Sequence, residues 1–170
     1  MKIILARSNT PLSWAIRLAT EEDGFPAAEG FSHVGTIMSD GVSVMDATMR
    51  SGVRPPRPLA SFQAYYPDHV IANIPCPRDD LGDEWNLAQV GKYYDFKALG
   101  AFVAPPWMTG RRNWQDPNRW FCSEKAAARA VACGFSFDRS LQFVSPNLLA
   151  FYAGLRPKAR PASLQGLMPA

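Results

Sequence analysis

The stretch at residues 120–132 constrains the fold more than any other part of the chain. Its sequence, Trp-Phe-Cys-Ser-Glu-Lys-Ala-Ala-Ala-Arg-Ala-Val-Ala, passes from two aromatic residues into a run of strong helix formers. This change predicts a helix that begins at or near Cys122 and runs to about Cys133, with Gly134 just after its end. The small alanine side chains let such a helix pack closely on a sheet, so we expect it to lie at the centre of the fold.

The predicted position of Cys122 at a helix N-terminus has a chemical consequence. Unpaired backbone N–H groups and the positive end of the helix dipole stabilise a thiolate at such a position. The alternative is a buried cysteine that serves as a small apolar residue, which is the commoner role of a lone cysteine. Cys122 is therefore a candidate nucleophile only if the chain also supplies a base.

The chain has two histidines, and His33 is the better candidate for that base. It lies in an apolar, β-branched run at residues 31–38 that predicts a strand, and residues 42–48 alternate like the returning strand of a hairpin. Asp46 then lies on the neighbouring strand, where its carboxylate can orient the imidazole and stabilise its protonated form. The alternative is a half-buried structural histidine and an aspartate that binds local backbone. For His69 we expect a surface or structural role.

Taken together, these motifs resemble those of a known superfamily. Ser-His-Val-Gly at 32–35 is followed by Asp-Ala at 46–47, by Gly-Lys-Tyr-Tyr-Asp-Phe-Lys-Ala-Leu at 91–99, and by Trp-Phe-Cys-Ser-Glu at 120–124. This order resembles the circularly permuted branch of the NlpC-type papain-like superfamily, which includes the YiiX/YaeF-like bacterial proteins and the lecithin:retinol acyltransferase-like proteins. The resemblance spans roughly residues 13–132. It implies an α+β fold with an antiparallel sheet, in which the catalytic cysteine helix follows the histidine strand and packs on the sheet.

The resemblance also implies a role for each matching residue. Cys122 matches the nucleophile, His33 the general base and Asp46 the third polar residue. Asp46 departs from the pattern of the superfamily, because Glu or His is the expected residue at that position. The residues that we expect to bind the substrate or the oxyanion are Tyr94, Ser123 and Trp120.

A cysteine, a histidine and a carboxylate in this arrangement catalyse acyl transfer through a thioester. The resemblance implies a cysteine peptidase or amidase-like hydrolase, a thiol protease of bacteria or phage, that acts on a short peptide such as a cell-wall stem peptide. A lipid or amine acceptor would instead make the protein an acyltransferase or thioesterase. A third alternative is a catalytically idle domain that serves binding within a phage or secretion assembly. The expected partner is thus a small peptide or acyl substrate.

The composition limits the remaining classes of function. The 170 residues, 47% hydrophobic and 19% charged, fit a single globular domain, expected over 1–155 with an extended or mobile tail over 156–170. The formal charge of +3 is spread along the chain, so nucleic acid is not an expected partner. Two isolated histidines and three scattered cysteines match no metal-ligand spacing, so we expect neither a metal nor a cofactor.

The sequence also bears on the location of the protein. No stretch approaches the roughly 18 apolar residues of a transmembrane segment. The N-terminal apolar run is too short for the central segment of a signal peptide. We therefore expect a cytoplasmic protein as synthesised, with release from the cell or association with a phage as alternatives. The oligomeric state stays open.

Periodicity and capping residues predict the other elements. These are strands at 1–7 and 70–75, helices at 10–20, 79–92 and 145–152, an irregular crossing at 49–57, and an aromatic loop at 93–107.

Overall fold

The computed structural model describes residues 1–103, 116 and 118–157. It combines helices with a main sheet of five strands in the order β6-β3-β2-β1-β7. All of the pairings in this sheet are antiparallel. The expected class, α+β with an antiparallel sheet, is therefore confirmed.

The main sheet and two small sheets contain all the described strands. The main sheet consists of β1 (Lys2–Ala6), β2 (His33–Ile37), β3 (Ser43–Met45), β6 (Arg57–Pro58) and β7 (His69–Asn73). The small sheets pair β4 (Ala47–Thr48) with β5 (Gly52–Val53) and β8 (Tyr93–Tyr94) with β9 (Arg119–Trp120). The helices are α1 (Pro11–Ala19), α2 (Leu59–Tyr65), α3 (Gly82–Leu87), α4 (Phe96–Val103), α6 (Cys122–Ala132) and α7 (Pro146–Tyr152). Short 3-10 turns lie at Glu21–Asp23, Asp79–Leu81 and Leu141–Phe143.

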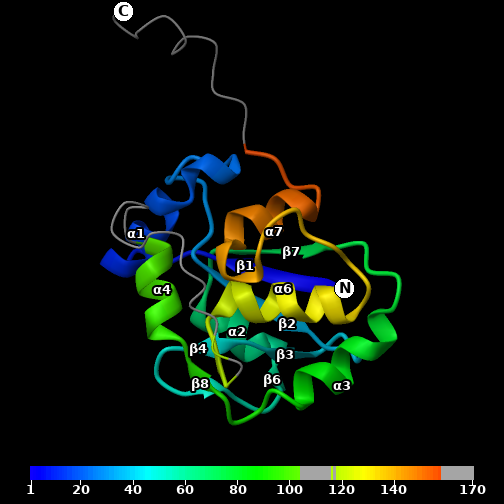
Figure 1. Ribbon diagram of the computed structural model, residues 1–170. Helices are drawn as coiled ribbons and strands as arrows, with labels where there is room; N and C mark the ends of the chain where they lie inside the picture. Colours follow the sequence, from blue (N-terminus) through cyan, green and yellow to red (C-terminus); the bar gives the residue numbers. More distant parts are fainter. Residues whose placement is uncertain (104–115, 117, 158–170) are drawn as a thin grey trace, which may run out of the picture.

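Strand β1 lies inside the molecule and buries both of its faces. Ile3 and Leu5 belong to a core cluster that also contains alanines of α6 and leucines of α7. Ile4 and Ala6 point to the other face, where they pack with Phe62 of α2. Figure 1 shows α6 and α7 over the near face of the sheet. The sheet is thus enclosed between α6 and α7 on one face and α2 on the other.

Helix α6 has the boundaries that the sequence predicts. It begins at Cys122 and ends at Ala132, and Gly134 follows with a φ of 86°. Glycine adopts this left-handed conformation without the steric cost of a Cβ atom, so it ends the helix cleanly. Cys122 is therefore the first helical residue, as expected.

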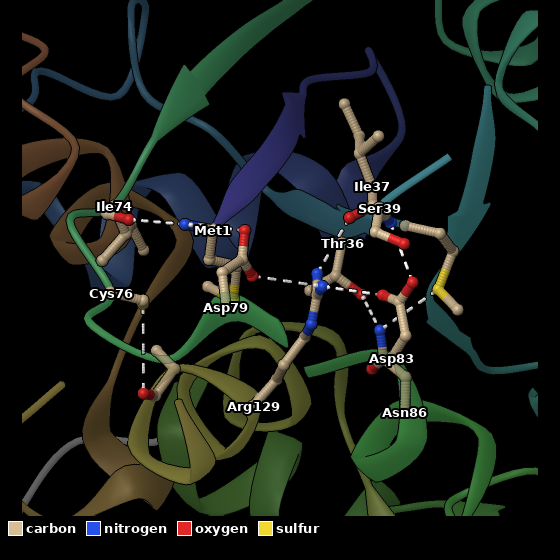
Figure 2. A network of polar contacts seen from close by, with 12 residues as sticks. Met1, Thr36, Ile37, Ser39, Ile74, Cys76, Asp79, Asp83, Asn86 and Arg129 are labelled. Carbon is tan, nitrogen blue, oxygen red and sulfur yellow. Dashed lines mark hydrogen bonds and ion pairs between the residues drawn. The ribbon is translucent and has the colours of Figure 1, made fainter. Parts of the chain in front are cut away.

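Buried polar side chains, as well as alanines, hold α6 in place. The Arg129 Nη1 atom donates to the carbonyl of Ile37 in β2 at 2.9 Å, and Nη2 donates to Oδ1 of Asp83 in α3 at 3.0 Å (Figure 2). Arg129 also contacts Oδ1 of Asp79 at 3.4 Å. An arginine can be buried this deeply because carboxylates and a carbonyl bind both of its terminal nitrogens, although its Nε has no hydrogen-bond partner among the described residues. The network joins the cysteine helix to the histidine strand.

Several of the other predicted elements are confirmed. Strands β1 and β7 occupy the segments expected at 1–7 and 70–75. Helix α1 opens at Thr10, whose side chain accepts a hydrogen bond from the Ser13 N–H, and helix α7 opens at Ser145, which accepts from the Leu148 N–H. Both helices carry proline in the first turn, where its missing N–H removes no helical hydrogen bond.

Three predictions about local structure are wrong. The helix expected at 79–92 is shorter: a 3-10 turn occupies Asp79–Leu81 and α3 spans only Gly82–Leu87. Leu87 and Val90 are 50% and 38% exposed whereas Asn86 is buried with hydrogen-bond partners, so the apolar residues do not mark the buried face of a long helix. The aromatic loop expected from residue 93 begins instead with strand β8 and helix α4. The irregular crossing at 49–57 contains β5, which pairs with β4.

Some expectations fall outside the described residues. These are the tail beyond residue 157 and the part of the aromatic segment at 104–107. Within the described ranges, no helix combines the length and the apolar character needed to cross a membrane.

Candidate active site

His33 and Asp46 meet at the end of the predicted hairpin. His33 is the first residue of β2, and Asp46 lies in the gap between β3 and β4. The two strands pair through Thr36–Met45 and Ile37–Val44. Continuing this register places Asp46 opposite Gly35, two residues after His33. The side chains of His33 and Asp46 are therefore diagonal neighbours on one face of the sheet. The distance between His33 Nε2 and Asp46 Oδ2 is 2.8 Å.

The protonation of this pair follows from its surroundings. Burial acts to raise the pKa of Asp46, but the hydrogen bond from His33 and the charges of His33 and Arg57 lower it below its usual value. Asp46 is therefore an ionised acceptor, and the Nε2–H group of His33 is the donor. Burial acts to lower the pKa of His33, yet the charge of Cys122 and hydrogen bonds with Asp46 and Cys122 raise it to about 10. The imidazole is thus poised to hold a positive charge at neutral pH.

Cys122 interacts with the same imidazole. The charge of Cys122 and a side-chain hydrogen bond with it are among the causes that raise the pKa of His33. Because Nε2 of His33 bonds to Asp46, Nδ1 is the ring nitrogen left to exchange a proton with sulfur. Cys122 is 5% exposed, and the residue before it, Phe121, provides no side-chain cap for α6. No side chain of the N-cap residue therefore competes for the N–H groups of the first turn, which favour negative charge at the start of a helix.

Arg57 is a further member of the site that the sequence reasoning missed. Its Nη2 atom donates to Asp46 Oδ2 at 3.0 Å, the same oxygen that accepts from His33. The guanidinium lies 5.1 Å from the centre of the Phe62 ring. Arg57 follows two consecutive prolines in a segment without periodicity, so no sequence signal linked it to Asp46.

Two aromatic side chains, also missed, hold the His33 ring. Phe62 in α2 and Tyr66 just after it are roughly parallel to the imidazole, with centroids 5.8 and 5.0 Å away. Their spacing of four residues places both on one face of a helix, which is the one sequence signal that pointed to a shared contact. The stack fixes the orientation of the ring.

Tyr94, the third residue expected to bind the substrate or the oxyanion, lies within electrostatic range of Cys122. Its side chain is buried, and burial together with the charge of Cys122 raises its pKa. The pKa of Tyr66 is raised by burial and by the charges of Asp46 and Cys122. Both phenols therefore stay protonated and remain hydrogen-bond donors beside the cysteine.

The other two predicted binding residues, Ser123 and Trp120, have different surroundings. The Ser123 side chain is fully buried, and its Oγ has no hydrogen-bond partner among the described residues. Trp120 donates through its indole N–H to Gln89 Oε1 at 3.1 Å and packs edge-on against Trp85. Neither residue lines the hollow described next, so their roles in binding stay predictions.

A small hollow opens beside His33. Its volume is about 110 Å³, and its wall includes His33, Tyr66 and Tyr94 together with serines and threonines. Tyr66 and Tyr94, whose pKa values are raised in part by the charge of Cys122, are thus both in the wall of this hollow. His33, which interacts with Cys122, is the part of this wall that links the hollow to the cysteine.

Comparisons with known proteins add no identification. No protein-family model matches the chain, and a search of curated proteins gave no match. The described residues contain no group of three or more His, Cys, Asp or Glu side chains suited to a metal ion. The chemistry of the site is therefore inferred from its own geometry.

Proposed function

We propose that this protein is a cysteine-dependent hydrolase that cleaves an amide bond, built on the permuted NlpC-type papain-like fold. One observation carries the proposal: the imidazole of His33 interacts with the carboxylate of Asp46 on one side and with Cys122, the first residue of a helix, on the other. A nucleophile, a base and a residue that orients the base are the minimum set for acyl transfer.

In the proposed reaction, the Cys122 thiolate attacks the carbonyl carbon of the amide. The backbone N–H of Cys122 and the hydroxyl of Tyr94 stabilise the oxyanion that forms. His33 then gives its proton to the amide nitrogen, the C–N bond breaks, and the amine leaves a thioester on sulfur. Neutral His33 next takes a proton from water as the water oxygen attacks the thioester. The C–S bond breaks, the carboxylic acid departs, and the Cys122–His33 pair is restored.

The proposal is tested by incubating the protein with cell-wall stem peptides, N-acylated short peptides, acyl thioesters and lipids. We expect release of an amine from a peptide substrate and an acyl adduct on Cys122 in quenched samples, both detected by mass spectrometry. Cys122→Ala should abolish both signals, whereas Cys76→Ala should retain them. Equal turnover by Cys122→Ala would contradict the proposal, acyl transfer to an added lipid or amine would identify an acyltransferase, and no turnover of any substrate would favour the binding domain.

A further inference from the structure

The hollow beside His33 has a composition that restricts what can enter it. It lies where the segment between β1 and α1, the start of β2, and β4 come together. Its volume of about 110 Å³ is well below the roughly 300–1,000 Å³ of pockets that hold drug-sized ligands. Only a short chemical group fits, so a long acyl chain would have to lie mostly outside.

The wall of the hollow is polar but almost without charge. Among the described residues that line it, His33 is the only side chain that is charged at neutral pH. The two tyrosines stay neutral, because burial raises the pKa of Tyr66 and of Tyr94. No lysine or arginine among these residues is available to bind a carboxylate, and no acidic side chain is available to bind an amine. The charge of His33 is already paired with Asp46, so a charged group would lose its hydration without gaining a free ionic partner.

A chain of hydrogen bonds ends at a donor in this wall. The Ser8 N–H donates to Ser13 Oγ at 3.2 Å, and Ser13 Oγ donates to Ser32 Oγ at 2.6 Å. Ser32 is 6% exposed and lines the hollow next to His33. Because the Ser32 oxygen accepts this bond, its own hydroxyl hydrogen is free to be donated to a ligand.

The serine chain is held rigidly from behind. Arg17 donates to the carbonyl of Ser13 at 3.4 Å and to the carbonyl of Ser8 at 3.2 Å. Arg17 itself is 2% exposed and does not line the hollow. A donor that is fixed in place before a ligand arrives loses little conformational freedom on binding, which favours selective recognition.

We propose that this hollow is the acyl-side subsite and selects a short, uncharged acyl group that carries its own amide, whose carbonyl accepts a hydrogen bond from Ser32. The inference rests on the proposed function, since it concerns the acyl part of the substrate that Cys122 attacks. It narrows the substrate class to peptide-like acyl groups and disfavours both fatty acyl chains and charged ones.

The kinetic test compares 4-nitrophenyl esters of three short acids. N-acetylglycyl carries the amide, 4-methylpentanoyl replaces it with carbon in the same shape, and succinyl adds a negative charge. After subtraction of the Cys122→Ala rate, we expect kcat/KM to be at least about tenfold higher for the N-acetylglycyl ester than for either of the others. Ser32→Ala should lower kcat/KM for that ester by about three- to tenfold, the usual effect of one hydrogen bond, and leave the 4-methylpentanoyl ester unchanged.

Two further variants support the interpretation. Ser13→Ala should give a smaller, selective loss for the amide-bearing ester, because Ser32 then loses the donor that orients its hydroxyl. Ser39→Ala, in the exposed turn at the far end of β2, should match the wild type. Equal rates for the N-acetylglycyl and 4-methylpentanoyl esters, or an equal loss for both in Ser32→Ala, would overturn the subsite while the Cys122-dependent rate still supports the hydrolase.

A binding experiment keeps the subsite testable if no ester is turned over. N-acetylglycinamide and 4-methylpentanamide are titrated into the ¹⁵N-labelled Cys122→Ala protein and followed by NMR. We expect N-acetylglycinamide to shift the amide signals of Ser13 and Ser32, and Ser32→Ala to weaken this binding. Absence of such shifts, or equal binding of both amides, would overturn the subsite independently of catalysis.

Discussion

At the scale of single residues, the site depends on one carboxylate oxygen that accepts hydrogen bonds from two positively charged side chains. Asp46 Oδ2 accepts from His33 at 2.8 Å and from Arg57 at 3.0 Å. Arg57 keeps the carboxylate ionised and in place, and the carboxylate in turn favours the protonated form of His33. The interaction of Cys122 with His33 is therefore linked through Asp46 to Arg57.

Asp46→Asn tests this chain of charges, because it keeps the shape of the side chain and removes its charge. The pKa of His33 is about 10, so in the wild type the imidazolium persists through neutral pH and is lost as the pH rises through that value. In the variant we expect amide hydrolysis to fall off at a pH lower by about one unit or more. The rate at neutral pH should fall less than in Cys122→Ala or His33→Ala. A pH–rate profile of kcat/KM measures both effects, and an unchanged alkaline limb would remove Asp46 from the site.

Lys125 is a second residue whose ionisation matters, this time for stability. It is buried, and its Nζ donates to Asn86 Oδ1 at 2.6 Å. Burial and the charge of Arg129 lower the pKa of Lys125 from 10.5 to about 7. Between these values the unfolded chain holds a proton that the folded protein has released, so this residue makes folding more favourable as the pH rises.

The corresponding prediction concerns Lys125→Met. We take the difference in the free energy of unfolding, variant minus wild type, at each pH. This difference should be higher at pH 6 than at pH 9.5 by a few kcal/mol, because methionine has no charge to desolvate. His33 also titrates in this range, but it is present in both proteins and its contribution largely cancels. Urea unfolding at the two pH values measures the difference. If the difference between variant and wild type were the same at both pH values, the charge of Lys125 would not destabilise the folded protein, which would contradict this prediction.

At the scale of elements, the site depends on close packing of α2 against β2. Gly35 in β2 leaves room for this contact, because a Cβ atom there would lie 2.7 Å from Val44 Cγ2 and 3.2 Å from Phe62 Cε2. Phe62 also stacks on His33. The glycine two residues after His33 is thus explained by the packing of the helix whose Phe62 stacks on the His33 ring.

Gly35→Ala should therefore affect both stability and activity. We expect a loss of about 1–3 kcal/mol in the free energy of unfolding from overpacking, with reduced turnover as Phe62 moves away from His33. Gly100→Ala in α4 is the matched control. A Cβ atom at Gly100 would meet no atom of the described residues within 4 Å, and alanine there should stabilise the helix by about 0.5–1 kcal/mol. Thermal unfolding and ester hydrolysis give the two readouts. Equal stability of Gly35→Ala and wild type would contradict this account of the packing.

At the scale of the whole molecule, the candidate site brings together segments that the sequence could relate only in part. The His33–Asp46 hairpin and the start of α6 were predictable, because turn residues and helix formers act locally. The approach of Cys122 to His33 was expected only from the family resemblance, since nothing local joins residues so far apart in the chain. Arg57 and Tyr66 were missed because they reach the site through tertiary packing.

The central claim is the pairing of Cys122 with His33, and the rate of Cys122 alkylation by iodoacetamide at pH 6 tests it most directly. At this pH an ordinary thiol is almost entirely protonated, so a paired thiolate reacts much faster. Burial raises the pKa of Cys76 and of Cys133, which makes both slow internal references.

We expect Cys122 to be alkylated at least about tenfold faster in the wild type than in His33→Ala, with His69→Gln matching the wild type. Peptide mass spectrometry follows each cysteine separately, so the comparison between variants concerns the same sulfur in the same fold. A Cys122 rate that is unchanged in His33→Ala would contradict the account.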